Sequence, residues 1–261
     1  MRDKILLFIP AYNCENQITR VLLSISSDIA NSLSEILIVE NRGNDSTLTM
    51  ACRYAREIKG CPVTIIQNDE NYSLGGSHKV AFKYCLDNNF DYIIVLHGDD
   101  QGNINDIMPI IMSKDYRHYD ALLGARFSKD SKLIGYSKFR IFGNLVLNKL
   151  LSICAKYEVL DMGSGLNMYS RKVLKDNSFM HFPNDLTFNI SLLLHLIKEK
   201  YSILFFPLIW REEDQISNAK IFRQSLKILK LALEFVYNKN CLYKRNDSTL
   251  YTWKCIQRNE E

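Results

Sequence analysis

The sequence predicts an α/β protein built on a doubly wound, mostly parallel sheet that is flanked by helices. Through the first half of the chain, short apolar segments alternate with segments whose apolar residues recur at helical spacing, and such alternation is typical of a parallel sheet. One apolar segment, residues 91–96, is followed closely by the acids Asp99 and Asp100. This pattern predicts a buried strand whose carboxyl end delivers acids to the edge where open α/β sheets bind ligands.

The predicted elements of the first half follow the order strand, helix, strand. Residues 5–10 form an apolar strand, and residues 15–26 carry apolar residues at the spacing of one helix face. Further strands are expected at residues 35–39, 63–67 and 91–96, and further helices at residues 47–58 and 74–86. Connections between the parallel strands are expected to be right-handed.

The second half of the chain is less regular. Strands are expected at residues 120–126 and 201–207, and helices at residues 139–156, 185–198 and 219–237. The first of these helices is amphipathic, with a polar stripe at four-residue spacing. The last is basic on one side and apolar over a broad face, so it either lies on a membrane or packs that face on its own domain.

Length and composition favour one large domain with a small appendage. The chain has 261 residues, of which 47% are hydrophobic and 24% charged, as in ordinary globular proteins. Its first residues do not resemble a signal peptide, and no apolar stretch reaches the roughly 18–20 residues that span a bilayer. The seven cysteines are scattered and show no CxxC spacing, which favours reduced thiols in a cytoplasmic protein.

Positive charge is concentrated near the C-terminus. Residues 220–258 contain nine Lys and Arg against two acids, a net charge of +7, whereas the whole chain carries +4. A basic region of this kind indicates either an anionic partner, such as phospholipid head groups, or simply a solvated tail.

Common nucleotide and hydrolase motifs are absent from the sequence. No GxGxxG follows the first predicted strand, and no GxxxxGK(S/T) occurs, so dinucleotide redox chemistry and P-loop chemistry lack support. HExxH and GxSxG are also absent, which leaves zinc and serine hydrolase functions without support.

Several short motifs, taken in order, resemble those of family 2 glycosyltransferases with the GT-A fold. In the first half they are residues 9–15, 38–41, 71–76 and 98–101. In the second half, residues 124–127, 140–144, 161–165 and 210–220 resemble the polyprenyl-phosphate sugar transferase branch, which includes dolichyl-phosphate mannosyltransferase-like enzymes. Each motif alone is weak, but the ordered set is strong and spans residue 4 to about residue 225.

The resemblance implies an inverting glycosyltransferase of the hexosyltransferase class. It would move a sugar from a UDP- or GDP-sugar to a lipid-linked acceptor, either a polyprenyl phosphate or an envelope polysaccharide intermediate, with no nucleic acid as partner. The GT-A domain is expected over residues 1–218, with a nucleotide-binding half (1–115) and an acceptor-binding half (116–218). A basic helix and tail (219–261) would follow, in contact with an anionic membrane on its cytoplasmic face.

The same resemblance implies a divalent cation, Mg²⁺ or Mn²⁺, held by Asp99. Loss of a nucleoside diphosphate builds negative charge on the departing phosphate, and a fixed cation neutralises such charge. Arg211 and Lys220 would contact the diphosphate or an acceptor phosphate, although Arg211 could instead pair with a neighbouring Glu. Asp185 stands at the position of the family's general base. A phosphate acceptor needs no base, and Asp185 would then only cap the helix that follows.

The remaining site residues are assigned by the resemblance to substrate binding. Pro10, Tyr12, Glu15, Glu40 and Asn41 would lie by the nucleoside, and Asp161, Ser164 and Gly165 would shape the acceptor side. Asp100 would lie near the cation. The resemblance gives no finer place for the other substrate-binding residues, which are Gly75, Gln101, Arg126, Arg140 and Ser217.

The chain departs from the family pattern at three places. His97 replaces the first acid of the metal motif, Glu40 and Asn41 replace two aspartates, and Asn184 replaces a Glu before Asp185. Two other functions therefore stay open. A nucleotidyltransferase acting on a sugar phosphate would normally carry a glycine-rich basic loop after the first strand, which residues 11–15 lack. A catalytically inactive relative that serves as a binding subunit is the second alternative.

Overall fold

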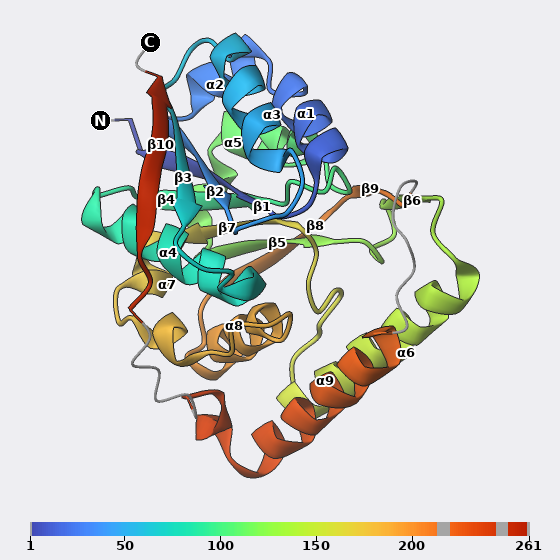
Figure 1. Ribbon diagram of the computed structural model, residues 1–261. Coiled ribbons are helices and arrows are strands. Elements are labelled where there is room, and N and C mark those ends of the chain that lie inside the picture. The colour runs from blue at the N-terminus through green and yellow to red at the C-terminus, as the bar shows by residue number, and fades with distance from the viewer. Residues whose placement is uncertain (1, 213–219, 244–249, 260–261) are drawn as a thin grey trace.

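The structure is a computed structural model that describes residues 2–212, 220–243 and 250–259 (Figure 1). Its central sheet has eight strands. Across the sheet they are β10 (Trp253–Asn259), β3 (Val63–Asn68), β2 (Glu35–Glu40), β1 (Ile5–Ala11), β4 (Tyr92–Leu96), β7 (Leu166–Ser170), β5 (Ala121–Ala125) and β8 (Ile203–Pro207). A small second sheet pairs β6 (Lys132–Ile134) with β9 (Ile209–Arg211).

Most neighbouring strands of the central sheet run parallel. Strand β1 is parallel to β2 and β4, β2 is parallel to β3, and β5 is parallel to β8. Only β7 and β10 run antiparallel to their neighbours within the described part of the sheet. The predicted α/β architecture with a mostly parallel sheet is therefore confirmed.

Helices cover both faces of the sheet, because alternate residues of each strand point to opposite sides. In β1, Leu6 and Phe8 join one hydrophobic cluster, whereas Leu7 and Ile9 join another. The second cluster contains α1 (Glu15–Leu23), α2 (Ser27–Ser32), α3 (Thr47–Tyr54) and α5 (Met108–Ser113). The first contains α4 (Ser73–Asp87), α6 (Lys138–Ala155), α7 (Arg171–Leu174), α8 (Phe188–Lys198) and α9 (Lys220–Tyr237).

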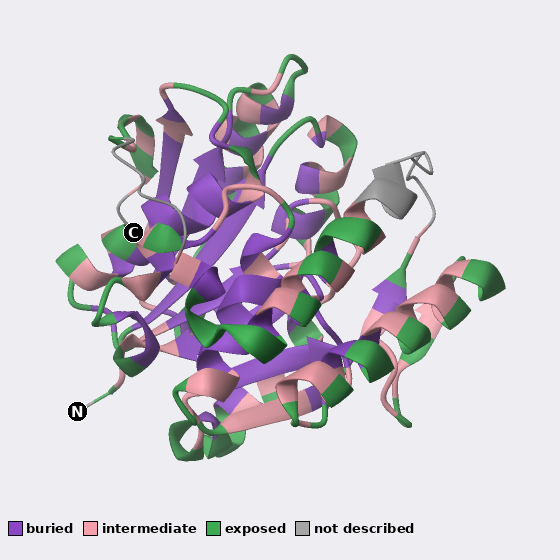
Figure 2. Cartoon of the chain, turned by 90° about the horizontal axis from the view of Figure 1, so that it is seen from below, coloured by how far each residue is buried: buried purple, intermediate pink, exposed green. Residues whose placement is uncertain are grey.

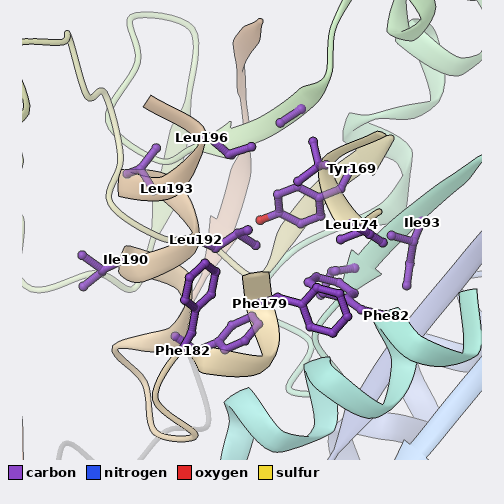
Figure 3. Packing of buried hydrophobic residues seen from close by; sticks show 14 of the residues in the cluster. Phe82, Ile93, Tyr169, Leu174, Phe179, Phe182, Ile190, Leu192, Leu193 and Leu196 are labelled. Carbon is purple, nitrogen blue, oxygen red and sulfur yellow. The ribbon is translucent and has the colours of Figure 1, made fainter. Parts of the chain in front are cut away.

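Aromatic side chains dominate the first cluster. Figure 3 shows Phe82 of α4 packed near Phe179, Phe182 and Tyr169, with leucines of α8 beside them. The rings of Phe82 and Phe179 meet edge to face at 5.3 Å between centroids, a favoured geometry for aromatic pairs. This cluster anchors α8 and the loop before it, which carries Asp185.

Several predicted helix ends differ from the structure. Helix α1 stops at Leu23 rather than residue 26, because Ser26 accepts a hydrogen bond from the Ile29 amide and caps α2. Helix α3 ends at Tyr54 and continues as a 3₁₀ turn. Helix α8 begins at Phe188 rather than residue 185, since residues 185–187 form a turn before it.

The two long helices α6 and α9 lie side by side at one corner of the molecule (Figure 1). Ile228, Ala232 and Phe235 of α9 are buried in the first cluster. Of the two arrangements considered for this helix, the structure shows the one in which its apolar face packs on its own domain. Among the helices of the described chain, none combines the length and the apolar character that crossing a membrane requires.

The segment expected as a C-terminal tail ends in strand β10, which pairs with the edge strand β3. Four of its seven residues are polar or charged (Lys254, Gln257, Arg258 and Asn259), so its sequence has no continuous apolar run that predicts a strand. Figure 2 shows the contrast between the buried central strands and the exposed outer faces of the peripheral helices.

Candidate active site

Several of the residues assigned to the site follow strands that end at one edge of the central sheet. The carboxyl ends of β1 and β2 lie together, because Ala11 pairs with Glu40. Strand β4 ends at Leu96, which pairs with Leu166 at the start of β7. The loops after β1, β2 and β4 and the segment before β7 therefore meet at this edge, as open α/β sheets require for a ligand site.

Three backbone hydrogen bonds to other segments hold the chain after β4. The His97 amide donates to the carbonyl of Gly165 at 2.8 Å, and the Gly98 amide donates to that of Pro10 at 3.1 Å. The Arg211 amide of β9 donates to the carbonyl of Gln101 at 3.0 Å. A β-carbon at position 98 would lie only 2.9 Å from the Pro10 oxygen, so this approach requires glycine.

Asp99 and Asp100 point to different partners. Asp100 adopts a left-handed conformation with φ of 58°, and its carboxylate accepts a hydrogen bond from Nε of Arg20 at 2.5 Å. Oδ1 of Asp99 instead accepts from the Gln101 amide at 3.3 Å. Asp99 is the acid that stands beside His97, with 4.0 Å between its Oδ2 and Nδ1 of the imidazole.

His97 is neutral at pH 7. Burial lowers the pKa of His97 to about 4, and the positive charge of Arg126 acts in the same direction. Its Nε2 is a buried nitrogen with no hydrogen-bond partner among the described residues. The ring lies against Gly165, where a β-carbon would approach it to 3.0 Å. Gly165 thus makes room for the imidazole.

Asp99 and His97 offer a carboxylate and a neutral imidazole, a donor pair that suits a divalent transition metal such as Mn²⁺. The described residues contain no group of three or more His, Cys, Asp or Glu side chains that could hold a metal. A cation at Asp99 would therefore take further ligands from water and from substrate phosphates, as Mg²⁺ and Mn²⁺ commonly do in phosphate sites. The residues present fit such an ion.

On the nucleoside side, most assigned residues hold the loops in place. Oε1 of Glu40 accepts from the Gly43 amide at 2.6 Å, and Oε2 accepts from Gln67 at 2.8 Å. Oδ1 of Asn41 accepts from Asn68 and from the Tyr72 amide, both at 2.9 Å.

Two further nucleoside-side residues differ in exposure. Glu15 accepts from the Ser46 amide at 2.9 Å, which joins the loops after β1 and β2. Tyr12 is 46% exposed and keeps an accessible ring face for a base. Pro10, by contrast, lies in the buried strand β1.

Gly75 brings the start of α4 against the loop before α8. Its amide donates to the Asn184 carbonyl at 2.6 Å, and a β-carbon there would lie 2.5 Å from the Pro183 oxygen. Any larger residue at position 75 would push away the loop that carries Asp185.

Arg126 and Asp161 form a buried ion pair on the acceptor side. Nε and Nη2 of Arg126 donate to the two Asp161 oxygens, each at 2.7 Å. Nη2 also donates to the Gly163 carbonyl at 2.9 Å, and the guanidinium lies over the Trp210 ring at 5.1 Å. The charge of Asp161 contributes to raising the pKa of Arg126 above its usual range against the opposing effect of burial. Ser164 beside them is buried and bonds the Leu166 carbonyl.

Arg140 pairs with Glu212, which follows β9, and its guanidinium lies 5.0 Å from the centre of the Tyr136 ring. Asn144, one turn later in α6, donates to the Tyr136 hydroxyl at 3.0 Å. Arg211 itself is exposed. Ser217 and the side chain of Lys220 lie outside the described residues.

Asp185 is engaged by two partners. Its Oδ1 accepts from the amide and the hydroxyl of Thr187 at 2.9 and 2.5 Å, and Oδ2 accepts from Lys227 of α9 at 2.6 Å. Burial alone would raise the pKa of Asp185, but these hydrogen bonds and the lysine charge hold it below its usual value. The carboxylate is therefore ionised, and its Oδ1 caps the turn at residues 185–187 that precedes α8.

Three neighbours of the assigned residues were not predicted from the sequence, namely Lys227, Glu212 and Trp210. Lys227 is 42 residues from Asp185, and Glu212 is 72 residues from Arg140. No local pattern links partners at such separations. Trp210 lies in the 210–220 motif, and an indole is the ring that binds cations best, but the cation over it is Arg126 rather than the adjacent Arg211.

Comparison with known proteins places the chain among glycosyltransferases. The model of the family described as glycosyl transferase family 2 matches residues 7–177. The UDP-N-acetylglucosamine–dolichyl-phosphate N-acetylglucosaminyltransferase of Methanococcus voltae is 26% identical over 192 residues, which cover 67% of this chain and 73% of that protein.

Solved structures share the fold. Glucosyl-3-phosphoglycerate synthase of Mycobacterium tuberculosis matches with a TM-score of 0.63 at 15% identity, over 94% of this chain and 82% of that chain. Residues 1–349 of S. aureus TarS match with a TM-score of 0.57 at 18% identity, over 93% and 76%. The predicted GT-A architecture is confirmed by these matches.

Proposed function

This chain belongs to glycosyl transferase family 2, and we propose that it transfers a sugar from a UDP-sugar to a lipid phosphate with inversion at the anomeric carbon. That it is a glycosyltransferase follows from the family. The observation that carries the proposal is the juxtaposition of Asp99 and His97 at the carboxyl end of β4. The buried Arg126–Asp161 pair lies near enough for the Arg126 charge to act on His97. The edge thus offers a carboxylate and an imidazole for a cation, and a guanidinium held by Asp161.

Relatives support a UDP-sugar as the donor. The Methanococcus voltae relative is named for UDP-N-acetylglucosamine, and TarS has been crystallised with UDP-GlcNAc. The synthase from M. tuberculosis has been crystallised with UDP. The exposed Tyr12 ring offers the base a stacking surface, while Glu40 and Asn41 hold the surrounding loops.

A divalent cation completes the donor site. The M. tuberculosis synthase has been crystallised with Mn²⁺ and UDP, and Asp99 with His97 would hold the ion here. When bound, the ion neutralises charge on the departing diphosphate. Arg211, exposed on β9 and tied through its amide to Gln101, can reach the same phosphates with its guanidinium.

A lipid phosphate suits the acceptor side. A phosphate oxygen of the acceptor forms the new bond to the anomeric carbon, and the bond from that carbon to the UDP oxygen breaks on the opposite face. No proton has to be removed from an ionised phosphate, so Asp185 needs no role as a base. Its pairing with Lys227 agrees with a positioning role. The name of the M. voltae relative includes dolichyl phosphate as acceptor.

The enzyme would work at the cytoplasmic face of a membrane, in the assembly of an envelope polysaccharide or a related lipid-linked glycan. The excess of basic residues after position 220 agrees with contact with anionic lipid.

The proposal is tested by measuring transfer of the sugar to the lipid phosphate. Protein is incubated with UDP-GlcNAc, UDP-glucose or GDP-mannose, Mn²⁺ and undecaprenyl phosphate, and the lipid product and the released nucleotide are identified by mass spectrometry. A sugar-phospholipid and UDP are expected. Release of pyrophosphate from UTP and a sugar phosphate would instead indicate a nucleotidyltransferase, and binding of UDP-sugar without turnover would indicate an inactive relative.

A further inference from the structure

The outer face of α6 exposes a continuous stripe of apolar side chains. Phe139, Phe142, Val146, Leu150 and Ile153 follow one another at spacings of three or four residues and are 83%, 67%, 41%, 38% and 63% exposed. Residues at these spacings lie on one helix face. We call this set the α6 stripe. Monomeric proteins rarely leave such a stripe uncovered unless it meets a partner or a membrane.

Lysines line one side of the α6 stripe. Lys138, Lys149 and Lys156 are exposed. The spacing of eleven residues places Lys138 and Lys149 on the same side of the helix, and Lys156 is the left-handed residue that ends it. Helix α6 contains no Asp or Glu. An apolar face bordered by lysines is the pattern of helices that lie in the head-group region of a bilayer, because lysine stems can lie along the hydrocarbon while their amines reach lipid phosphates.

A surface groove of about 460 Å³ runs beside the same helix. Apolar side chains of α6, of the loop after it and of Phe127 line the groove, namely Phe127, Leu145, Ile153, Val159 and Leu160. Polar side chains share the lining, and they are Asn148, Lys149, Ser152, Lys156 and Glu158. Phe127 and Leu160 are chain neighbours of Arg126 and Asp161, so the groove adjoins the acceptor side of the site.

We propose that α6 lies on an anionic membrane with the α6 stripe among the lipid chains, and that the groove takes the hydrocarbon chain of the lipid phosphate acceptor. The proposal rests on the acceptor class proposed above and adds the surface that delivers it. A chain in the groove would hold its phosphate near Arg126 and Asp161, with Lys149 and Lys156 among the phosphates of surrounding lipids.

The lysines favour lipid over a second copy of this chain. In a symmetric dimer formed through α6, each stripe would face itself. The three lysines of each copy would then lie near those of the other. Helix α6 supplies no acid, and Glu158 of the following loop, which lines the groove with Lys149 and Lys156, sets one negative charge against three positive ones. An anionic bilayer supplies the missing negative charge. The helix also lies at a corner of the molecule (Figure 1), clear of the central sheet.

The first experiment measures binding of the full chain to vesicles. Wild-type protein is sedimented with phosphatidylcholine vesicles, with and without phosphatidylglycerol. The double variant Phe142→Asp with Ile153→Asp should bind at least about tenfold more weakly, since two large apolar side chains leave the bilayer. Lys149→Gln with Lys156→Gln should lose roughly fivefold per lysine on the anionic vesicles only.

Met112 provides the matched control, because it is 72% exposed on α5 and distant in sequence from α6. Met112→Asp should bind vesicles as the wild type does, and circular dichroism should show every variant folded. Equal binding by all variants would overturn the proposal. A dimer in solution that Phe142→Asp dissociates, without vesicle binding, would replace it with self-association.

The second experiment distinguishes binding of the acceptor's hydrocarbon chain in the groove from sugar transfer itself. Transfer is measured to undecaprenyl phosphate and to the short, soluble citronellyl phosphate. Leu145→Asn and Leu160→Asn should lower kcat/KM about tenfold for the long chain and much less for the short one, because only the long chain fills the groove. Equal losses on both acceptors would overturn the groove assignment. Failure of the wild type to use either acceptor, with α6-dependent vesicle binding intact, would instead refute the acceptor class.

Discussion

The carboxylate of Asp161 accepts three hydrogen bonds from one residue, because the amide, Nε and Nη2 of Arg126 all donate to it. The two side chains are 11% and 0% exposed, so the pair is buried. No hydrogen bond between described residues involves Nη1 of Arg126, so this nitrogen is the one that we expect to donate to the acceptor phosphate proposed above. The pair thus holds a guanidinium rigidly at the site.

Removal of Asp161 should be costly for stability. Asp161→Leu leaves Arg126 as an uncompensated buried charge, and we expect a loss of about 3–5 kcal/mol in the free energy of unfolding. The double variant Arg126→Met with Asp161→Leu should lose less than the single variant, because no charge is left unpaired. Urea titrations of the three proteins test this. A double variant that is less stable than Asp161→Leu would contradict it.

Replacement of Asp99 should abolish most turnover. Asp99→Asn removes the charged oxygen that would hold the cation, and we expect a loss of at least about 10²-fold in kcat. The neighbouring acid serves as a comparison, since Asp100 pairs with Arg20 and Asp100→Asn should cost much less. Steady-state release of UDP measures both. Similar rates for Asp99→Asn and the wild type would remove this carboxylate from the mechanism.

His97 should set which metal is preferred. An imidazole nitrogen favours Mn²⁺ over Mg²⁺, whereas carboxylates serve both ions. His97→Asp should therefore narrow the ratio of the Mn²⁺ and Mg²⁺ affinities from roughly tenfold or more toward unity. Calorimetric titration of each ion in the presence of UDP gives that ratio without reference to turnover. An unchanged ratio would show that the imidazole does not touch the ion.

Asp185 should be more important for structure than for proton transfer. Asp185→Asn keeps an oxygen for the Thr187 amide and loses the charge that pairs with Lys227, so we expect a decrease of less than about tenfold in kcat with undecaprenyl phosphate. Lys227→Met should give a similar, small effect. A loss of about 10²-fold or more confined to Asp185→Asn would identify a general base and favour a hydroxyl acceptor.

Acid should destabilise the fold through its buried histidines. Burial lowers the pKa of His78 to about 3 and that of His97 to about 4, whereas an unfolded His titrates near 6.5. Between about pH 4 and 6.5 the unfolded chain binds more protons, so stability falls as the pH is lowered through this window. His78→Phe should flatten the decline by about 1.4 kcal/mol per pH unit near pH 5. Urea midpoints at pH 5 and 7 measure the difference. An identical slope would exclude His78 as a source.

Much of the fold was accessible from sequence because parallel strands buried on both faces are continuous apolar runs. Strands β1, β2 and β4 have this character, whereas β3 has it only in part, because Thr64 interrupts the run and Gln67 and Asn68 end it. Strand β7 was not predicted because its five residues include Asn167 and Ser170 and follow a glycine-containing turn. Strand β10 was not predicted because it lies at the sheet edge, where one face of a strand can stay polar.

The candidate site could also be predicted in part from the sequence. Motifs that end strands meet at one edge whatever the details of the loops, so the grouping of Asp99, Arg126 and Asp161 could be expected. Their partners could not. Lys227 and Glu212 come from segments far along the chain, and pairing over such distances depends on tertiary packing. The left-handed turn at Asp100, which separates two adjacent acids, also has no signature in the residue type.

The antiparallel pairing of β10 with β3 has a consequence for biosynthesis. While the chain emerges from the ribosome, β3 remains an open edge until residues 253–259 are released, some 190 positions after β3 itself. Open edges recruit other strands. Nascent copies on one messenger would thus be most prone to wrong pairing late in translation, and a chaperone that shields β3 would have its greatest effect then.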